Sequence, residues 1–457
     1  MSVMRYHSRQ VIFAAFFFLL AATLYCEDTV ESKRRDVLKY GLEPDIIDLV
    51  QTLQSEKNTD YTADLSALFE STRSVSVKNG ILALFADENL DALKPNALSV
   101  LTDPFDEPKD LVRQILAYVS KLGIKEAAPM VRKLVESENA DFRDAAIQTL
   151  GKIGSADDAQ YMIGLMDSDI PGDEKQRLIV RQNIMAALGD MKAVGIRDKL
   201  AEIAKDKDEN AVIRASAATA LGKMENPEDA PALIALFSET DPMLRTASIA
   251  ALGTVRTPEA KATILEAFKD SYYKVRLEAL GAAEKQQLAE AIPYVRYRAK
   301  TDPVPAVRMR AFETLGKFDD AESRAWLLSL VAADSCPDAD RAKAADVLVS
   351  SDYPCDFTEI EKAVLATFKD DKKIKLRYEF GKVLTKKKDP RPEAIANAFI
   401  ASKDTITKSI GLDFYDKNRY GSMTDAVKAI AADEKQGALG KRAKKLLGSE
   451  SAPKSTD

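Results

Sequence analysis

The sequence is poor in the residues that most catalytic and metal sites need. Its 457 residues include one histidine, three cysteines and one tryptophan. A single histidine excludes multi-histidine metal sites and most catalysis that uses an imidazole base. Glycine loops of the G-x-G-x-x-G or Walker type are missing, as is a C-x-x-C pair. The sequence therefore predicts no catalytic residue, no metal and no cofactor, and we expect a protein that is not an enzyme.

An excess of positive charge is also missing. Lys and Arg total 66 against 72 Asp and Glu, which gives a formal net charge of −6. Nucleic-acid-binding proteins usually carry a basic field. The balance therefore favours a protein partner and no nucleic acid.

The first 26 residues have the layout of a secretory signal. Arg5 and Arg9 precede an apolar run over 11–25, and a basic start followed by such a run is typical of signal peptides. The run is shorter than the ~20 residues of a comfortable membrane span. We expect an exported protein of the periplasm or cell envelope, and an uncleaved anchor is the alternative.

The end of this segment allows two kinds of processing. Cys26 is a candidate lipidation site, which would attach the protein to a membrane, although the bulky Tyr25 before it departs from the small residue of that motif. The alternative is simple cleavage near residues 23–26. Either event would remove His7 and leave a mature chain without histidine.

Cys336 and Cys355 are the remaining cysteines, and an oxidising compartment would permit a disulfide between them. A helix expected near 339–350 would hold its ends about 18 Å apart. A disulfide needs Cα atoms within about 7 Å. The bridge therefore requires a fold-back of residues 350–354, and it stays open at this stage.

One pattern recurs along most of the chain. An apolar residue and an arginine are followed by small residues and then by Leu-Gly, as in FRDAAIQTLG at 142–151, IRASAATALG at 213–222 and LRTASIAALG at 244–253. Spacings between the arginines run from 30 to 38 residues and average 33. A fixed period in this range indicates a repeat array. The arginines are Arg113, Arg143, Arg181, Arg214, Arg245, Arg276, Arg308, Arg341 and Arg377.

An acidic residue stands six positions before the arginine in six of the nine copies. This offset places the acid in the turn that precedes the arginine helix. Acid–arginine pairs across stacked turns would tie adjacent repeats together, so we interpret the arginines as structural; a ligand-binding row is the alternative. The acids are Glu107, Asp208, Glu239, Asp270, Asp302 and Asp371.

Each copy is expected to fold as two helices. Apolar or small residues at i, i+4, i+7 and i+8 form one helical face. Pro129, Pro231 and Pro293 lie near the start of the preceding helix, where a missing N–H costs little. The repeated glycines are expected to end the second helix in the left-handed conformation. They are Gly151, Gly189, Gly222, Gly253 and Gly316.

These segments resemble HEAT-like repeats, specifically the short type shared with phycobilisome lyase subunits. The resemblance covers roughly residues 66–448 and is strong over 107–385. It implies an all-α solenoid of about 11–13 stacked helix pairs, used mainly to bind other proteins, and it transfers no catalytic residue. Residues 27–65 are expected to form an N-terminal helical cap, and the polar tail 449–457 is expected to be disordered.

Two surface features are candidate binding sites. The first is an aromatic and basic group in which Tyr297 and Arg298 are expected to approach Tyr272 and Tyr273 one repeat away, since Tyr and Arg are enriched in binding hot spots. The alternative is that the tyrosines cover the apolar seam and the arginines are solvated. The group also includes Tyr294 and Arg296.

The second is a basic stretch over 372–391, with nine basic residues against Glu379 and Asp389. It could attract an anionic lipid, an envelope polymer or an acidic partner, and a solvated helix face is the alternative. The stretch holds Lys372, Lys373, Lys375, Arg377, Lys382, Lys386, Lys387, Lys388 and Arg391.

The sequence thus favours a non-enzymatic protein-interaction scaffold outside the cytoplasm, with the partner on the concave face of the solenoid. One alternative is an envelope-binding or adhesin-like protein that uses the 372–391 stretch. Another is a lyase or chaperone-like protein acting on a bound cofactor, which the phycobilisome-lyase resemblance alone suggests.

Overall fold

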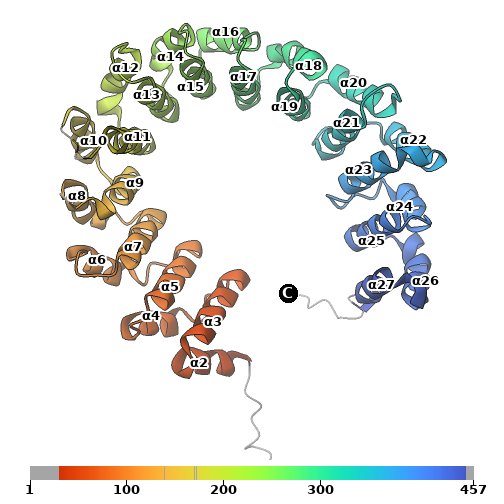
Figure 1. Ribbon diagram of the computed structural model, residues 1–457, viewed down its shortest axis with the longest axis horizontal. Coiled ribbons are helices and arrows are strands. Elements are labelled where there is room, and N and C mark those ends of the chain that lie inside the picture. The colour runs from red at the N-terminus through yellow and green to blue at the C-terminus, as the bar shows by residue number, and fades with distance from the viewer. Residues whose placement is uncertain (1–29, 138, 169, 171, 449–457) are drawn as a thin grey trace, which may run out of the picture. The chain divides into compact units, whose positions relative to one another are not determined.

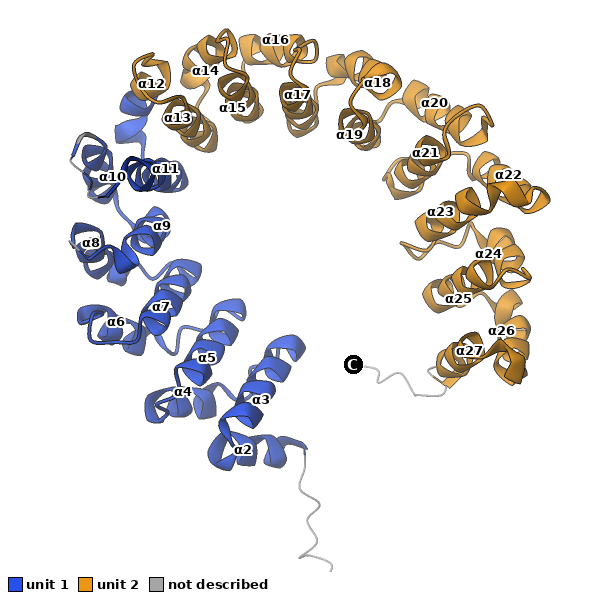
Figure 2. Cartoon of the chain, viewed as in Figure 1, with its two compact units in different colours: residues 1–200 blue, residues 201–457 orange. Residues whose placement is uncertain are grey.

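The expectation of an all-α protein is confirmed. A computed structural model describes residues 30–448 except 138, 169 and 171, and this part contains 26 α-helices and no strand (Figure 1). The segment predicted to be a signal, with Cys26, and the tail 449–457 lie outside the described residues. The chain divides into two compact units, residues 1–200 and 201–457 (Figure 2).

Unit 1 contains ten helices and the start of an eleventh, α12 (Arg197–Lys205), which crosses residue 200. The ten are α2 (Val30–Tyr40), α3 (Glu43–Glu56), α4 (Thr62–Ser71), α5 (Val75–Asp87), α6 (Lys94–Thr102), α7 (Lys109–Leu122), α8 (Ala128–Glu136), α9 (Arg143–Ile153), α10 (Ala156–Gly164) and α11 (Glu174–Met191). Short 3-10 helices precede several of them, including η2 (Ala140–Phe142), and η3 (Leu165–Asp167) follows α10.

Unit 2 continues the same alternation. Its helices are α13 (Ala211–Met224), α14 (Ala230–Phe237), α15 (Pro242–Leu252), α16 (Pro258–Ala267), α17 (Tyr273–Gln286), α18 (Ile292–Thr301), α19 (Pro305–Leu315), α20 (Ala321–Ala332), α21 (Asp338–Ser350), α22 (Phe357–Ala366), α23 (Ile374–Leu384), α24 (Glu393–Ile400), α25 (Thr405–Asn418), α26 (Thr424–Ala432) and α27 (Ala438–Gly448).

The helices of each unit stack in two rows. In unit 2 the odd-numbered helices α13 to α27 each contact the next odd-numbered helix, and they lie on the inner side of the curved stack in Figure 2. The even-numbered helices form the outer row. In unit 1 the helices α3, α5, α7, α9 and α11 contact one another in the same way. We call the odd-numbered helices the inner row and the others the outer row.

The predicted repeat register matches this arrangement. All nine repeat arginines lie in inner-row helices, from Arg113 in α7 to Arg377 in α23. Pro129, Pro231 and Pro293 stand at the first or second position of α8, α14 and α18. The 26 described helices form thirteen consecutive pairs, the upper end of the predicted range.

The predicted role of the repeated glycines is wrong. Gly151, Gly189 and Gly222 lie inside helices, and Gly253 and Gly316 have helical φ values of −59° and −67°. At the ends of α11, α13 and α17 the left-handed residues are Lys192, Glu225 and Gln287.

The glycines instead allow close contact between inner-row helices. A Cβ on Gly222 would lie 2.7 Å from the Cα of Ala251 in α15, and one on Gly151 would lie 2.8 Å from the Cα of Ala187 in α11. Both distances are too short for real atoms. The sequence pattern therefore marks helix-to-helix packing, since glycine lets two backbones approach.

The first helix pair is atypical, as expected for a terminal repeat. In α2 the sole described buried residue is Leu38, while Val30, Tyr40 and Leu42 at its ends are exposed. The next helix α3 buries four residues, Ile46, Leu49, Val50 and Leu53, and contacts α5. Helix α3 is thus the first described member of the inner row, and α2 buries little beside it.

The two described cysteines are free thiols and half-buried. Helix α21 lies between Cys336 and Cys355. The Sγ atom of Cys355 lies 3.8 Å from the carbonyl oxygen of Leu348 and 4.0 Å from Nη1 of Arg391. The bridge that the sequence left open is therefore not formed in this structure.

Candidate functional site

Most of the repeat arginines donate hydrogen bonds to backbone carbonyl groups of their own repeat. Nη1 of Arg276 donates to the carbonyl oxygens of Asp270 and Ser271 at 2.9 and 3.1 Å, and Nε of Arg214 donates to that of Ala204 at 3.1 Å. These carbonyls end the outer-row helix or begin the following turn, where helical partners are missing. Arg143, Arg245, Arg308, Arg341 and Arg377 make equivalent bonds.

Three consecutive arginines also bind the acid in the turn of the next repeat. Arg214 contacts Glu239 at 2.8 Å. Arg245 holds Asp270 through two hydrogen bonds of 2.7 and 3.0 Å. Arg276 holds Asp302 through two of 2.7 Å, with 5% and 0% of the two side chains exposed. In these three cases the acid six residues before one repeat arginine pairs with the arginine of the preceding repeat, which links neighbouring repeats.

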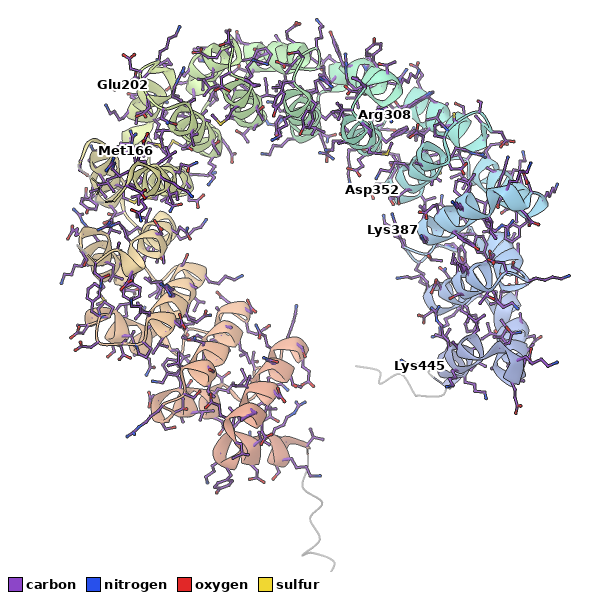
Figure 3. The ribbon with its side chains drawn as sticks, in the orientation of Figure 1. Met166, Glu202, Arg308, Asp352, Lys387 and Lys445 are labelled. Atoms are coloured by element: carbon purple, nitrogen blue, oxygen red, sulfur yellow. The ribbon has the colours of Figure 1, made fainter. Side chains whose placement is uncertain are left out.

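Arg113, Arg308, Arg341 and Arg377 are held in other ways. Arg308 has Ser335 in place of the next acid and bonds the carbonyl oxygen of Asp302 (Figure 3). Arg341 contacts Asp334 at 3.0 Å, and Arg113 contacts Asp110 at 3.3 Å on the surface. Arg377 is buried against the ring of Phe368. Arg181 lies half-buried in α11.

Hydrogen bonds keep these paired acids ionised. Burial alone would raise the pKa of Asp302, but the hydrogen bonds from Arg276 and from the backbone N–H of Val304 outweigh it, so the pKa is lowered. The pKa of Asp270 is lowered in the same way by Arg245 and the N–H of Tyr272 against the effect of burial.

These lowered pKa values predict acid sensitivity in unit 2. A carboxyl group whose pKa is lower when folded stabilises the fold fully above its unfolded value of about 3.9. That contribution is lost as the pH falls through the folded pKa. We expect the protection of amide hydrogens in α15, α17 and α19, relative to the intrinsic exchange rate at each pH, to fall below about pH 4, and to fall less steeply in an Asp302→Asn chain. The same pH profile in both chains would contradict the assignment.

The aromatic and basic group makes several separate pairwise contacts. Tyr272 and Tyr273 contact each other at a ring distance of 5.3 Å, while Tyr294 packs on Phe268 at 5.7 Å. Arg298 lies over the ring of Tyr297, which is 56% exposed, and reaches Asp302 at 3.4 Å. Arg296 pairs with Asp320 and Glu322 of the next repeat. Most of this group therefore contributes to repeat packing.

Four of the nine basic residues in the basic stretch form ion pairs. Lys373, Lys382, Lys386 and Arg391 contact Asp334, Glu379, Asp346 and Asp389 respectively. Lys387 donates to the carbonyl oxygen of Ser350 on the inner side of unit 2 (Figure 3). Lys372, Lys375 and Lys388 are exposed. Asp334 and Asp346 lie outside the stretch in sequence, so counting charge within 372–391 overlooks them.

Sequence reasoning missed a line of alternating charges on the inner row. Ion pairs with N–O distances of 2.8, 2.6 and 2.7 Å join side chains of neighbouring repeats. Ion pairs with N–O distances of 3.6 and 3.7 Å join side chains within one helix. This charge ladder runs from α17 to the end of α23. Its members are Glu284, Arg310, Glu313, Lys343, Asp346 and Lys386.

Next to the charge ladder lies a face without charge. In α13 and α15 it consists of the solvent-facing residues two and five positions after the repeat arginine. In α17 it includes the residue five positions after Arg276. Thr219 and Ala250 are exposed, and Ser216, Ala247 and Gly281 are half-buried. We call these five residues the uncharged face. Comparing these two positions between repeats would have revealed both surfaces from sequence.

Glu278 stands at the border of the two surfaces. Its side chain is half-buried in α17, and the carboxyl group makes no hydrogen bond to any described residue. Burial raises its pKa, while the charges of Arg310 and Lys285 act in the opposite direction. Arg310 donates its hydrogen bond to Glu284, at 2.8 Å, and not to Glu278. The Glu278 carboxyl group can therefore accept a hydrogen bond from a partner.

The described part of the chain offers no other obvious chemistry. Its Asp, Glu, Cys and His side chains form no group of three or more that could hold a metal ion. None of its helices combines the length and the apolar character needed to cross a membrane.

Several solved structures are similar in fold. The Escherichia coli protein YibA shares 18% identity at a TM-score of 0.37, covering 62% of this chain and all of its own. The karyopherin Kap121p, bound to the extreme C-terminus of the protein phosphatase Cdc14p, shares 12% sequence identity at a TM-score of 0.41. The match covers 98% of this chain and 57% of the length of Kap121p. The complex of CpcE and CpcF of phycocyanin lyase from Nostoc sp. PCC7120 shares 16% sequence identity at a TM-score of 0.27, and the match covers 70% of this chain and 94% of that chain.

No curated protein matches the chain. A family model described as spirochaete HEAT repeat protein matches residues 38–446, which include nearly all the described helices. The chain therefore belongs to the spirochaete HEAT repeat protein family.

Proposed function

We propose that this protein is a non-enzymatic interaction scaffold that binds a protein partner on the inner row of unit 2. The uncharged face, with Glu278 at its edge, is the observation that carries the proposal. Small side chains at Thr219 and Ala250 let a partner approach the helix backbones closely. Glu278 would receive a lysine, an arginine or another hydrogen-bond donor from that partner.

The surrounding charges give the contact a register. Every member of the charge ladder already has an opposite charge beside it, so the ladder itself calls for no net charge on the partner. A wrong register would place partner charges against like charges, which costs several kcal/mol by order of magnitude. The partner segment is therefore mainly apolar and small, with one basic group placed to reach Glu278.

Photo-crosslinking tests this surface. A crosslinking residue at 219 or 250 should trap one defined protein in cells that express the chain. The matched control is position 262, where Ala262 is also exposed but lies on the outer-row helix α16. Equal products from the inner and outer positions, or none from the inner ones, would overturn the proposal.

We also propose that the protein acts outside the cytoplasm. The basic start and apolar run of residues 1–26 support export. Mass spectrometry of the mature protein should find an N-terminus between residues 24 and 27, with lipid on Cys26 if the membrane-attached form is the correct one. A mature chain that still begins at residue 1 would contradict cleavage.

A further inference from the structure

A cavity of about 200 Å³ opens in unit 1 among α8, α9, α10 and α11. Its wall is mostly apolar and includes Ile147, Ile170 and Ile184, each less than 10% exposed. Drug-sized ligands need about 300 Å³ or more, whereas an apolar cavity of about 150 Å³ holds benzene. The space therefore fits a small apolar body, such as a short aliphatic chain or one side chain.

A buried guanidinium group lies in this wall. Arg143 is 8% exposed and begins α9. Among the described residues its guanidinium makes one hydrogen bond, 2.7 Å long, from Nη2 to the carbonyl oxygen of Ser137. In unit 2 the equivalent Arg245 and Arg276 are each held by a carboxylate of the next repeat as well. The residue six positions before the next repeat arginine is here Lys175.

Among the residues that the structure describes, the nearby polar groups do not supply that carboxylate. Glu136 also lines the cavity, but its carboxylate accepts from Nε of Arg132 at 3.0 Å. Arg132 also lies over the Tyr161 ring, 4.1 Å from its centre. Burial, followed by the charge of Glu136, raises the pKa of Tyr161, so its hydroxyl group is protonated at neutral pH and can donate a hydrogen bond.

A buried charge is costly unless an opposite charge and hydrogen bonds compensate for it. We infer that this cavity binds a carboxylate with a short apolar body, with the carboxylate on Arg143 and the body between the isoleucines. Tyr161 lines the same cavity, and its hydroxyl group would donate to a ligand oxygen. The site would be a small-acid pocket in unit 1, separate from the protein-binding face proposed for unit 2.

Titration calorimetry of the full chain tests this inference with hexanoate as the probe and hexan-1-ol as its uncharged control. Hexanoate should bind, and Arg143→Met should weaken its binding at least about tenfold, the range of a charge-assisted hydrogen bond. Hexan-1-ol should bind weakly and equally to both chains. Equal affinity of hexanoate and hexan-1-ol for the unaltered chain would overturn the inference.

A second arm identifies the source of the carboxylate. A pentapeptide ending in leucine with a free carboxylate is compared with its C-terminal amide. Tighter binding of the free acid than of hexanoate assigns the site to a partner's chain end, and hexanoate binding alone assigns it to a free small acid; both support the pocket.

A further variant guards against misfolding. Val180→Trp fills the cavity from its half-buried edge and should block hexanoate while leaving Arg143 in place. Failure of hexanoate to bind the unaltered chain would overturn the pocket without affecting the inner-row proposal.

Discussion

Replacing Asp302 by alanine should destabilise the centre of unit 2 more than any single substitution on the protein's surface. The change leaves Arg276, with 5% of its side chain exposed, without a counter-charge. Removal of one partner from a buried ion pair costs about 3–5 kcal/mol. It would also remove the acceptor for Arg298 and for the N–H of Val304.

The loss should be regional because each repeat contacts mainly its neighbours. Hydrogen exchange measured across urea concentrations should show reduced protection in α17 and α19 and little change in α25 and α27. Ser335→Ala is the matched control, since Ser335 occupies the same turn position without an ion pair. An Asp302→Ala chain that stays within about 0.5 kcal/mol of the unaltered chain, the usual range of surface changes, would refute a structural role for the pair.

Replacing Gly222 by alanine should be the second most damaging change. The added Cβ would lie 2.7 and 2.8 Å from the Cα and Cβ of Ala251, so α13 and α15 must move apart. Overpacking of this kind costs about 1–3 kcal/mol. The loss should appear as a lower urea midpoint for the exchange of α13 and α15.

Gly281→Ala is the matched control for this change. Gly281 also lies inside an inner-row helix, α17, but a Cβ there would meet nothing within 4 Å. Alanine is favoured over glycine in a helix interior by about 0.5–1 kcal/mol, so this variant should gain stability. If both alanine variants lost the same stability, the close approach of Ala251 to Gly222 could not be the cause of the loss.

The sequence alone was enough to predict the helix pairs, because the arginine and the small residues recur at a helical spacing. It also pointed to acids six residues before the arginines. It could not show that the arginines most often bind backbone carbonyl groups at the end of the outer-row helix or in the following turn, since a carbonyl group has no sequence signature.

Two other features depended on neighbours distant in sequence. The repeated glycines suggested helix ends, but Ala251 and Ala187 decide their role through close contact in the adjacent repeat. The basic stretch suggested an anion site, but Asp334 and Asp346 from earlier repeats pair with its lysines. Local composition could not reveal either contact.

The most direct test of the scaffold proposal is the crosslinking yield at position 219 in two further variants. Ala250→Arg places a long cation on the uncharged face, and Ala262→Arg makes the same change on the outer row. We predict that Ala250→Arg abolishes the partner crosslink while Ala262→Arg retains it, with helix content unchanged in both. Equal yields in the two variants would contradict recognition through the inner row.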